Sequence, residues 1–273
     1  MSTPFASAAP YYARYRPPYP GEFHTLLADR FALDGSQTVL DLGAGPGTLG
    51  LALAPVADHV YAVDPEPAML TEGARLAQER GITNISWLRG DDARITRLCL
   101  PRIDLCVIGR AFRRMDRERV LADLDEVLAP RGGVAVVESL YRPGDPRPAW
   151  LTVVEEVRGR FLGPVGPVGP GLSGQSGQSG QPDRDDWDDL VDRLAKSPLS
   201  RVETHQWDQP VRHTVDEVIG LQLSFSSSGP DRLGDRMAAF ETELRRALLD
   251  HDPRGTYART LRIGAAVATR PRR

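Results

Sequence analysis

Short apolar runs alternate with amphipathic stretches from Gln37 to Leu140. The apolar runs are rich in β-branched residues and nearly continuous, which is typical of strands that are covered on both faces. They predict strands over Thr38–Leu42, His59–Val63, Ile85–Leu88, Ile103–Ile108 and Gly133–Glu138. Between these strands, apolar residues at helical spacing predict helices over Pro67–Arg80 and Asp116–Leu128. The alternation indicates βαβ units around a mostly parallel sheet.

A helix is predicted ahead of this core, and a proline-rich stretch precedes that helix. Apolar residues between Phe23 and Phe31 recur at helical spacing. The stretch Tyr11–Pro20 reads YYARYRPPYP, and its prolines predict that no regular helix forms there.

The composition changes twice after the core. Trp150–Leu162 has helical spacing, and the low-complexity run GPVGPVGPGLSGQSGQSGQP between Gly163 and Pro182 predicts a disordered surface loop. Beyond this loop we expect helices over Asp185–Leu194, Val215–Leu223 and Leu233–Leu249, and strands near Val202–Trp207 and Leu261–Ala268.

Composition restricts the class of partner. The 273 residues carry a formal net charge of −3, which argues against nucleic acid and anionic membranes as partners, although arginines cluster locally between Arg110 and Arg119. The two cysteines suggest no disulfide framework, and no apolar stretch has the length of a signal peptide core or a membrane span. We expect a cytoplasmic protein that acts on a small molecule; a homodimer is compatible with the sequence.

The segment Val39–Gly50 reads VLDLGAGPGTLG, a buried strand that leads into a glycine-rich turn and then a helix. Glycines at 43, 45 and 47 let the backbone approach a ligand closely, and the following helix offers free N–H groups. Asp41, at the carboxyl end of the strand, provides a carboxylate for a cationic ligand group; the alternative is that it caps the next helix.

The spacing of these glycines differs from that of a dinucleotide site. The turn is G-x-G-x-G instead of G-x-G-x-x-G, and Pro46 removes one amide donor. Asp41 would repel a pyrophosphate but attract an ammonium group. Asp64 ends the second strand about twenty residues further on, where a carboxylate can accept protons from both ribose hydroxyls, and Asp91 and Asp92 follow the third strand.

The motifs VLDLGAGPG, AVDPEPAML and GDDA, in this order and spacing, resemble those of class I S-adenosylmethionine-dependent methyltransferases. The resemblance covers about Gln37–Leu140. It implies S-adenosyl-L-methionine as the cofactor, with the methionine part near Asp41, Gly43, Ala44 and Gly45. The remaining contacts it implies are Asp64 with the ribose, Glu66 and Met69 with the adenosine, and Asp92 and Ala93 with the adenine amino group.

Two further segments resemble a subgroup of small-molecule, natural-product methyltransferases. GRAFRRMD, from Gly109 to Asp116, stands where this subgroup has AFHWMD, so Arg113 and Arg114 depart from its pattern. The resemblance still implies that the methionine pocket is lined by Arg110, Ala111 and Phe112. The N-terminal YYARYRPPYP is similar to the subgroup's segment over the cofactor, which implies lid contacts from Tyr11, Tyr15 and Arg16.

These elements together predict an α/β fold: a Rossmann-like, doubly wound, mostly parallel seven-stranded sheet with a helical cap. We expect a lid segment and helix in residues 1–35 and the cofactor-binding core in residues 36–140. A cap and substrate region should occupy 141–258, with the disordered loop at 163–182. Residues 259–273 should form the closing strand of the sheet and a basic tail.

The expected activity is methyl transfer to a nitrogen or oxygen atom of a small metabolite, in natural-product biosynthesis. No catalytic residue follows from the sequence; His213, before a helix with Thr214 as its expected N-cap, and Tyr141, after the fifth strand, are candidates. The histidines and cysteines lack metal-ligand spacing, so no metal is expected. Two alternatives stay open. One is a catalytically silent cofactor-binding regulator, suggested by Arg113 and Arg114. The other is a nucleic-acid methyltransferase, although the sequence lacks the Asn-Pro-Pro-Tyr type of motif that such enzymes use on base amino groups.

Overall fold

The computed structural model describes residues 6–140, 145, 147–163 and 184–271. The chain divides into two compact units, which we describe separately. Unit 1 comprises Met1–Pro17, Ser139–Arg184 and Asp208–Arg262, and unit 2 comprises Pro18–Glu138, Asp185–Trp207 and Ile263–Arg273. Within the described ranges, no helix has both the length and the apolar composition needed to cross a bilayer.

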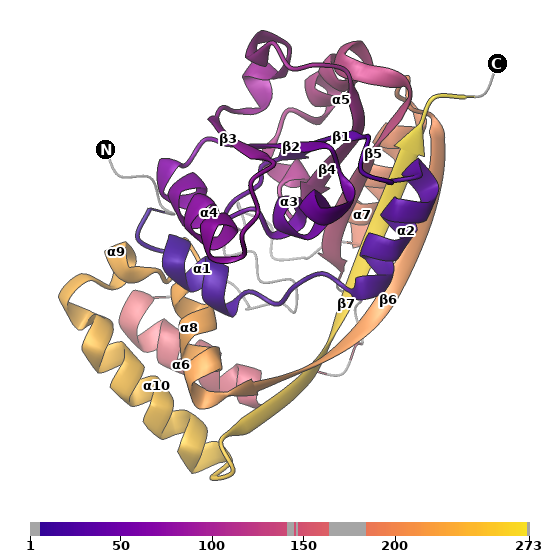
Figure 1. Cartoon of the computed structure of the whole chain (residues 1–273). Helices are drawn as coiled ribbons and strands as arrows, with labels where there is room; N and C mark the ends of the chain where they lie inside the picture. The colour runs from indigo at the N-terminus through magenta and orange to yellow at the C-terminus, as the bar shows by residue number, and fades with distance from the viewer. Residues whose placement is uncertain (1–5, 141–144, 146, 164–183, 272–273) are drawn as a thin grey trace. The chain divides into compact units, whose positions relative to one another are not determined.

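Helices and strands alternate through most of the chain (Figure 1). The helices are α1 (Ala9–Tyr15), α2 (Gly21–Phe31), α3 (Thr48–Leu53), α4 (Pro67–Glu79), α5 (Arg117–Val127), α6 (Trp150–Leu162), α7 (Arg184–Ala195), α8 (Val215–Leu223), α9 (Pro230–Leu233) and α10 (Met237–His251). The strands are β1 (Thr38–Leu42), β2 (His59–Asp64), β3 (Ile85–Arg89), β4 (Ile103–Gly109), β5 (Leu128–Leu140), β6 (Arg201–Thr214) and β7 (Thr256–Thr269).

The strands form a seven-stranded sheet of order β3-β2-β1-β4-β5-β7-β6. β1 pairs in parallel with β2 and with β4, and the pairs β2–β3 and β4–β5 are also parallel. The order reverses between β1 and β4, which is the switch point of a doubly wound sheet. The predicted Rossmann-like, mostly parallel seven-stranded fold is confirmed.

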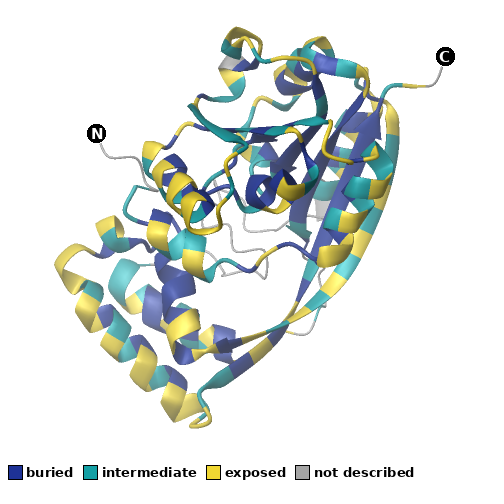
Figure 2. Ribbon diagram, in the orientation of Figure 1, coloured by how far each residue is buried: buried dark blue, intermediate teal, exposed yellow. Residues whose placement is uncertain are grey.

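The core of unit 2 consists of apolar side chains from the central strands, packed against those of α5 and α7. Leu40, Cys106 and Val134 are completely buried in adjacent strands, and Leu124 and Leu194 reach them from the two helices. Figure 2 shows β1, β4 and β5 as largely buried strands. Burial on both faces explains why these strands read as continuous apolar runs instead of alternating ones.

Unit 1 has a core of its own, built from α6, α8 and α10. Val154, Val218 and Leu244, one from each helix, are completely buried and belong to the same apolar cluster. The exposed residues of α10 lie along its outer face (Figure 2). The indole Nε1 of Trp150 donates to the carbonyl oxygen of Ala258 at 3.1 Å, which ties the start of α6 to β7.

Three local predictions were wrong. α1 occupies Ala9–Tyr15 and so overlaps Tyr11–Pro20, the stretch expected to lack a regular helix; Pro10 stands in its first turn, where a missing N–H costs little, and Pro17 follows its end. The helix expected over Leu233–Leu249 is interrupted at Gly234, whose φ of +53° separates α9 from α10. The strands β6 and β7 extend well beyond the predicted Val202–Trp207 and Leu261–Ala268. Tyr141 and residues 164–182 of the expected loop lie outside the described residues.

Candidate functional site

The carboxyl ends of β1 and β2 meet at one edge of the sheet in unit 2. Leu42 pairs with Val63, so the glycine turn that follows β1 lies directly beside the end of β2. The amides of Gly43 and Ala44 both donate to the carbonyl oxygen of Val63, at 2.8 and 3.0 Å. This edge, next to the switch point of the sheet, is where doubly wound folds bind their ligands.

In the glycine turn there is space beside the backbone at Gly45 but none at Gly47. Both residues have left-handed backbone conformations, with φ of +55° and +76°. A Cβ placed on Gly45 would meet no heavy atom of the described structure within 4 Å beyond its chain neighbours, whereas a Cβ on Gly47 would lie 2.4 Å from the ring of Trp87. A ligand can therefore approach the backbone at Gly45, while Gly47 is required by packing.

Asp64, the last residue of β2, binds the glycine turn to the start of α4. Its Oδ2 accepts from the amide of Gly45 at 2.8 Å, and its Oδ1 accepts from the amide of Glu66 at 2.9 Å. Burial raises the pKa of this carboxyl, and the two amide donors oppose that rise. Asp64 thus stands beside Gly45, and the ribose contact expected of it stays a prediction.

Glu66 is the N-cap of α4, and one of its two carboxylate oxygens has no hydrogen-bond partner among the described residues. Oε1 accepts from the amide of Ala68 at 3.2 Å. Oε2 is buried and has no hydrogen-bond partner among the described residues. An unsatisfied buried acceptor beside Asp64 can accept a hydrogen bond from a ligand.

Asp41 is 1% exposed and is directed at the helix that follows the glycine turn. Its Oδ2 accepts from the amide of Gly50, in the first turn of α3, at 2.8 Å. The capping contact that the sequence left open is therefore present in the structure. Burial raises the pKa of Asp41 to about 7, opposed by the Gly50 hydrogen bond, with a further rise from the charge of Asp64.

The raised pKa of Asp41 predicts a pH-dependent contribution to stability. Folding favours the protonated carboxyl, so the contribution is complete below about pH 4 and is lost as the pH rises to about 7. Asp41→Asn cannot titrate and can still accept from Gly50. We expect the free energy of unfolding of the wild type to fall relative to that of the variant across this range, by at most about 1.4 kcal/mol per pH unit. Urea denaturation at several pH values measures the difference; parallel curves would contradict the prediction.

Asp92 and its neighbours follow β3. The Oδ2 of Asp92 accepts from the amide of Asp116 at 2.9 Å and from Arg119 at 3.0 Å, which joins it to the start of α5. Asp91 caps the short 3₁₀ helix Asp92–Leu98 by accepting from the amide of Ala93 at 3.1 Å. Ala93 is exposed. The adenine contact expected of Asp92 and Ala93 stays a prediction.

The segment after β4 packs directly on the glycine turn. Arg110 has a left-handed backbone with φ of +55°, and its guanidinium lies 4.6 Å from the ring centre of Tyr19. A Cβ placed on Gly43 would lie 2.7 Å from the Cβ of Ala111, so these two residues are in close contact. Phe112 is completely buried in the core of unit 2, and Met69 is 3% exposed in the first turn of α4.

Comparison with known proteins shows what this part of the chain is similar to. Residues 39–132 match the family of methyltransferase domains. An uncharacterized methyltransferase of Mycobacterium tuberculosis is 33% identical over 165 residues, which are 60% of this chain and 63% of that protein. The match thus covers less than two thirds of the relative's length.

Solved structures show the same fold. A precorrin 8w decarboxylase from Methanobacterium thermoautotrophicum superimposes with a TM-score of 0.54 at 15% identity, over 94% of each chain. A putative methyltransferase from Bacillus halodurans gives 0.52 at 15% identity, over 92% of this chain and all of that one. At such low identity the similarity shows the fold alone.

Glu138 lies near the carboxyl end of β5 in unit 2 and was missed by the sequence analysis. It is 9% exposed, and its Oε1 has no hydrogen-bond partner within the part of the chain that the structure describes. Burial raises its pKa, against the opposing charges of Arg113, Arg110 and Arg114. The arginines that depart from the subgroup's pattern therefore stand around a buried carboxylate. The available signal was an acidic residue at the end of a predicted strand.

Four of the described residues that were site candidates from the sequence belong to unit 1: Tyr11, Tyr15, Arg16 and His213. Tyr11 stacks on Tyr15, with ring centres 6.3 Å apart, and Arg16 donates to the hydroxyl of Ser224 at 2.9 Å and lies over Phe225. His213 is 6% exposed, and burial, followed by the charge of Arg259, lowers its pKa to about 4. It is neutral and only weakly basic near pH 7, which does not suit a general base.

The expected N-cap next to His213 is confirmed. Thr214 accepts from the amide of Glu217 at 3.3 Å, and Glu217 accepts in return from the amide of Thr214 at 2.8 Å, which completes a capping box at the start of α8. Across the described residues, no group of three or more His, Cys, Asp and Glu side chains is arranged to hold a metal ion.

Proposed function

We propose that unit 2 is a methyltransferase domain that binds S-adenosyl-L-methionine at the carboxyl ends of β1 and β2, and that the chain transfers its methyl group to a nitrogen or oxygen of a small metabolite. The observation that carries the proposal is the pair of carboxylates Asp64 and Glu66 beside an open glycine turn. We further propose a natural-product type of acceptor and a cytoplasmic location, on the basis of the sequence resemblance and composition.

The donor and acceptor groups of this edge fit an adenosine with a cationic tail. Glu66 Oε2 lacks a donor among the described residues, and a ribose hydroxyl would supply one. Asp64 can accept a second hydroxyl with the lone pairs that its two amide bonds leave. Asp41 offers negative charge to an ammonium group, which would in turn lower its raised pKa.

The bound cofactor supplies an electrophilic methyl group on a sulfonium. The chain's own residues have to hold it in place, align the acceptor behind the methyl group and exclude water. A base is needed only where the acceptor must lose a proton. Because the pKa of His213 is low, we do not assign that role to it.

The proposed function is tested by measuring formation of S-adenosylhomocysteine with a panel of metabolites that carry free amino or hydroxyl groups. We expect formation above the background with one or more acceptors, and its loss in Asp64→Asn, which keeps the shape of the side chain but removes the charge. If S-adenosylmethionine binds and no acceptor on the panel is methylated, the regulatory alternative is favoured. Methylation of RNA or DNA instead would favour the nucleic-acid alternative.

A further inference from the structure

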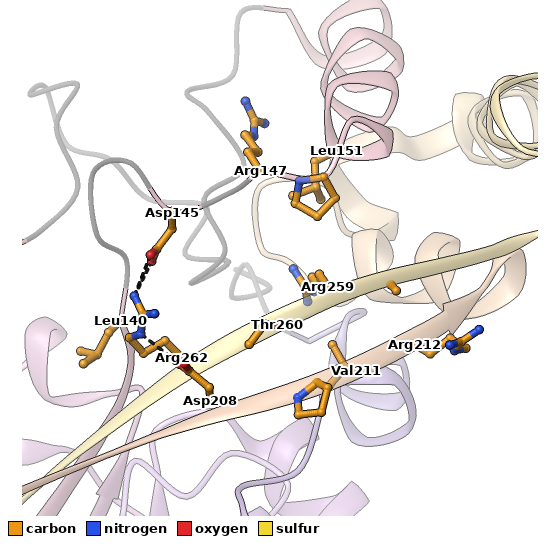
Figure 3. Close-up of a pocket in the computed structure, with 13 residues that line it drawn as sticks. Leu140, Asp145, Arg147, Leu151, Asp208, Val211, Arg212, Arg259, Thr260 and Arg262 are labelled. Carbon is orange, nitrogen blue, oxygen red and sulfur yellow. Dashed lines mark hydrogen bonds and ion pairs between the residues drawn. The ribbon is translucent and has the colours of Figure 1, made fainter.

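Unit 1 contains a pocket of about 490 Å³ that none of the residues discussed for the cofactor lines. Its walls come from β6, β7 and the start of α6, with Asp145 before that helix (Figure 3). Leu140, Leu151 and Val211 give it an apolar part. A partly apolar cavity of this size, with a few convergent polar groups, is typical of a site for a small organic ligand.

The charged side chains of the pocket are mostly arginines. Among the described lining residues, four arginines face two aspartates. Both aspartates bind the same arginine: Arg262 donates to Asp145 at 2.6 Å and to Asp208 at 3.0 Å (Figure 3). Arginines thus outnumber aspartates among the described residues that line the pocket, and both aspartates bind Arg262.

Of the other arginines that line the pocket, Arg147 forms an ion pair with Glu155 of α6. Arg212 is exposed and lines the pocket from β6. Arg259 lines it from β7, is only 5% exposed, and projects toward the start of α6 in Figure 3. The pocket thus combines a buried guanidinium in its wall with a solvent-exposed one.

Arg259 has a neutral neighbour. The ring of His213 stands edge-on to Trp150, with centres 6.3 Å apart, and the guanidinium of Arg259 helps to keep this imidazole uncharged. A guanidinium presents parallel N–H donors that match the two oxygens of a carboxylate or phosphate, and such pairs strengthen in a partly apolar environment.

We propose that this pocket binds a small organic anion, whose carboxylate or phosphate group contacts Arg259 and Arg212 and whose apolar part packs on Leu140, Leu151 and Val211. The proposal concerns unit 1 alone and does not depend on methyl transfer. A protein without methyltransferase activity could still bind the anion, so the two proposals fail separately.

The probes are phenylacetate and phenyl phosphate, which carry the two oxyanion groups on the same apolar ring, and phenylacetamide as the neutral match of phenylacetate. We expect calorimetric titration of the full chain to show saturable binding of at least one anion, and binding of the amide that is weaker by about tenfold or more. Tighter binding of phenylacetate would indicate a carboxylate ligand, and tighter binding of phenyl phosphate would indicate a phosphate ligand. Equal affinity for phenylacetate and its amide, with no binding of phenyl phosphate, would overturn the proposal, as would no binding of either anion.

Two arginine variants locate the site. Arg259→Gln should weaken anion binding by about tenfold or more, and Arg212→Gln by about threefold, since it is exposed. Arg254→Gln is the matched control, because this arginine of unit 1 binds Asp252 at the surface and does not line the pocket. If Arg259→Gln does not fold, the anion affinity of Arg212→Gln alone tests the proposal. Unchanged affinity in Arg212→Gln and in any folded Arg259→Gln would place the anion elsewhere and contradict the proposal.

Discussion

Gly47→Ala is expected to lower the free energy of unfolding by roughly 2–5 kcal/mol, the largest effect on stability that we predict for a single methyl group. About 1–2 kcal/mol comes from forcing a residue with a Cβ into the left-handed conformation at φ of +76°. A further 1–3 kcal/mol, roughly, comes from the contact of that Cβ with the ring of Trp87, at 2.4 Å.

Trp87 has little room to move away from this contact. A Cβ on Gly73, in α4, would lie 2.2 Å from the same ring, so the indole is held between the glycine turn and the helix. Two glycines distant in sequence thus make space for one aromatic side chain. Urea denaturation of the wild type and Gly47→Ala measures the loss.

Gly45→Ala is the matched control for this prediction. Gly45 is also left-handed, with φ of +55°, but a Cβ there meets no heavy atom within 4 Å in the described structure beyond its chain neighbours. It should lose only about 1–2 kcal/mol of stability, from the backbone conformation alone. Its cofactor affinity should nevertheless fall, because the added methyl group occupies the approach to the turn. Equal losses of stability in the two variants would show that Trp87 does not restrict this site.

Asp64→Ala is expected to reduce the affinity for S-adenosylmethionine by at least about tenfold. The hydrogen bond that the carboxylate of Asp64 would accept from a ribose hydroxyl is worth about 1.5–3 kcal/mol. The substitution also removes the acceptor of the Gly45 and Glu66 amides, which position the glycine turn and the start of α4. Isothermal titration of both proteins measures the change.

Asp58→Ala provides the control for Asp64→Ala. Asp58 is exposed and precedes β2, at the opposite end of that strand from Asp64. Its affinity for the cofactor should equal that of the wild type. A folded Asp64→Ala that binds as tightly as Asp58→Ala would remove Asp64 from the site.

The parts of the fold that follow from local patterns were predictable. The strands β1 to β4 were expected within a residue of their ends, since continuous apolar runs bounded by glycine, proline and aspartate identify buried parallel strands. The acids Asp41 and Asp64 at the ends of β1 and β2, and the glycines that follow β1, indicated which edge of the sheet holds the candidate site. These signals are contained within short segments of the sequence.

Features that depend on contacts between distant segments were not predictable. The position of Trp87 between Gly47 and Gly73 and the arginines around Glu138 involve residues from separate elements. The helix α1 was missed for a different reason: the prolines of Tyr11–Pro20 were expected to exclude a helix from the whole stretch, although the first of them, Pro17, comes after α1 has ended at Tyr15. The pocket around Arg259 requires β6, β7 and the start of α6 together, and no single segment indicates it.

The central claim is that the edge formed by Asp41, Gly45, Asp64 and Glu66 binds S-adenosylmethionine. Calorimetric titration of the full chain with S-adenosylmethionine and, separately, with NAD tests it most directly. We predict saturable binding of S-adenosylmethionine at one site per chain and no binding of NAD. Absence of binding with S-adenosylmethionine, or saturable binding of NAD in its place, would contradict the account.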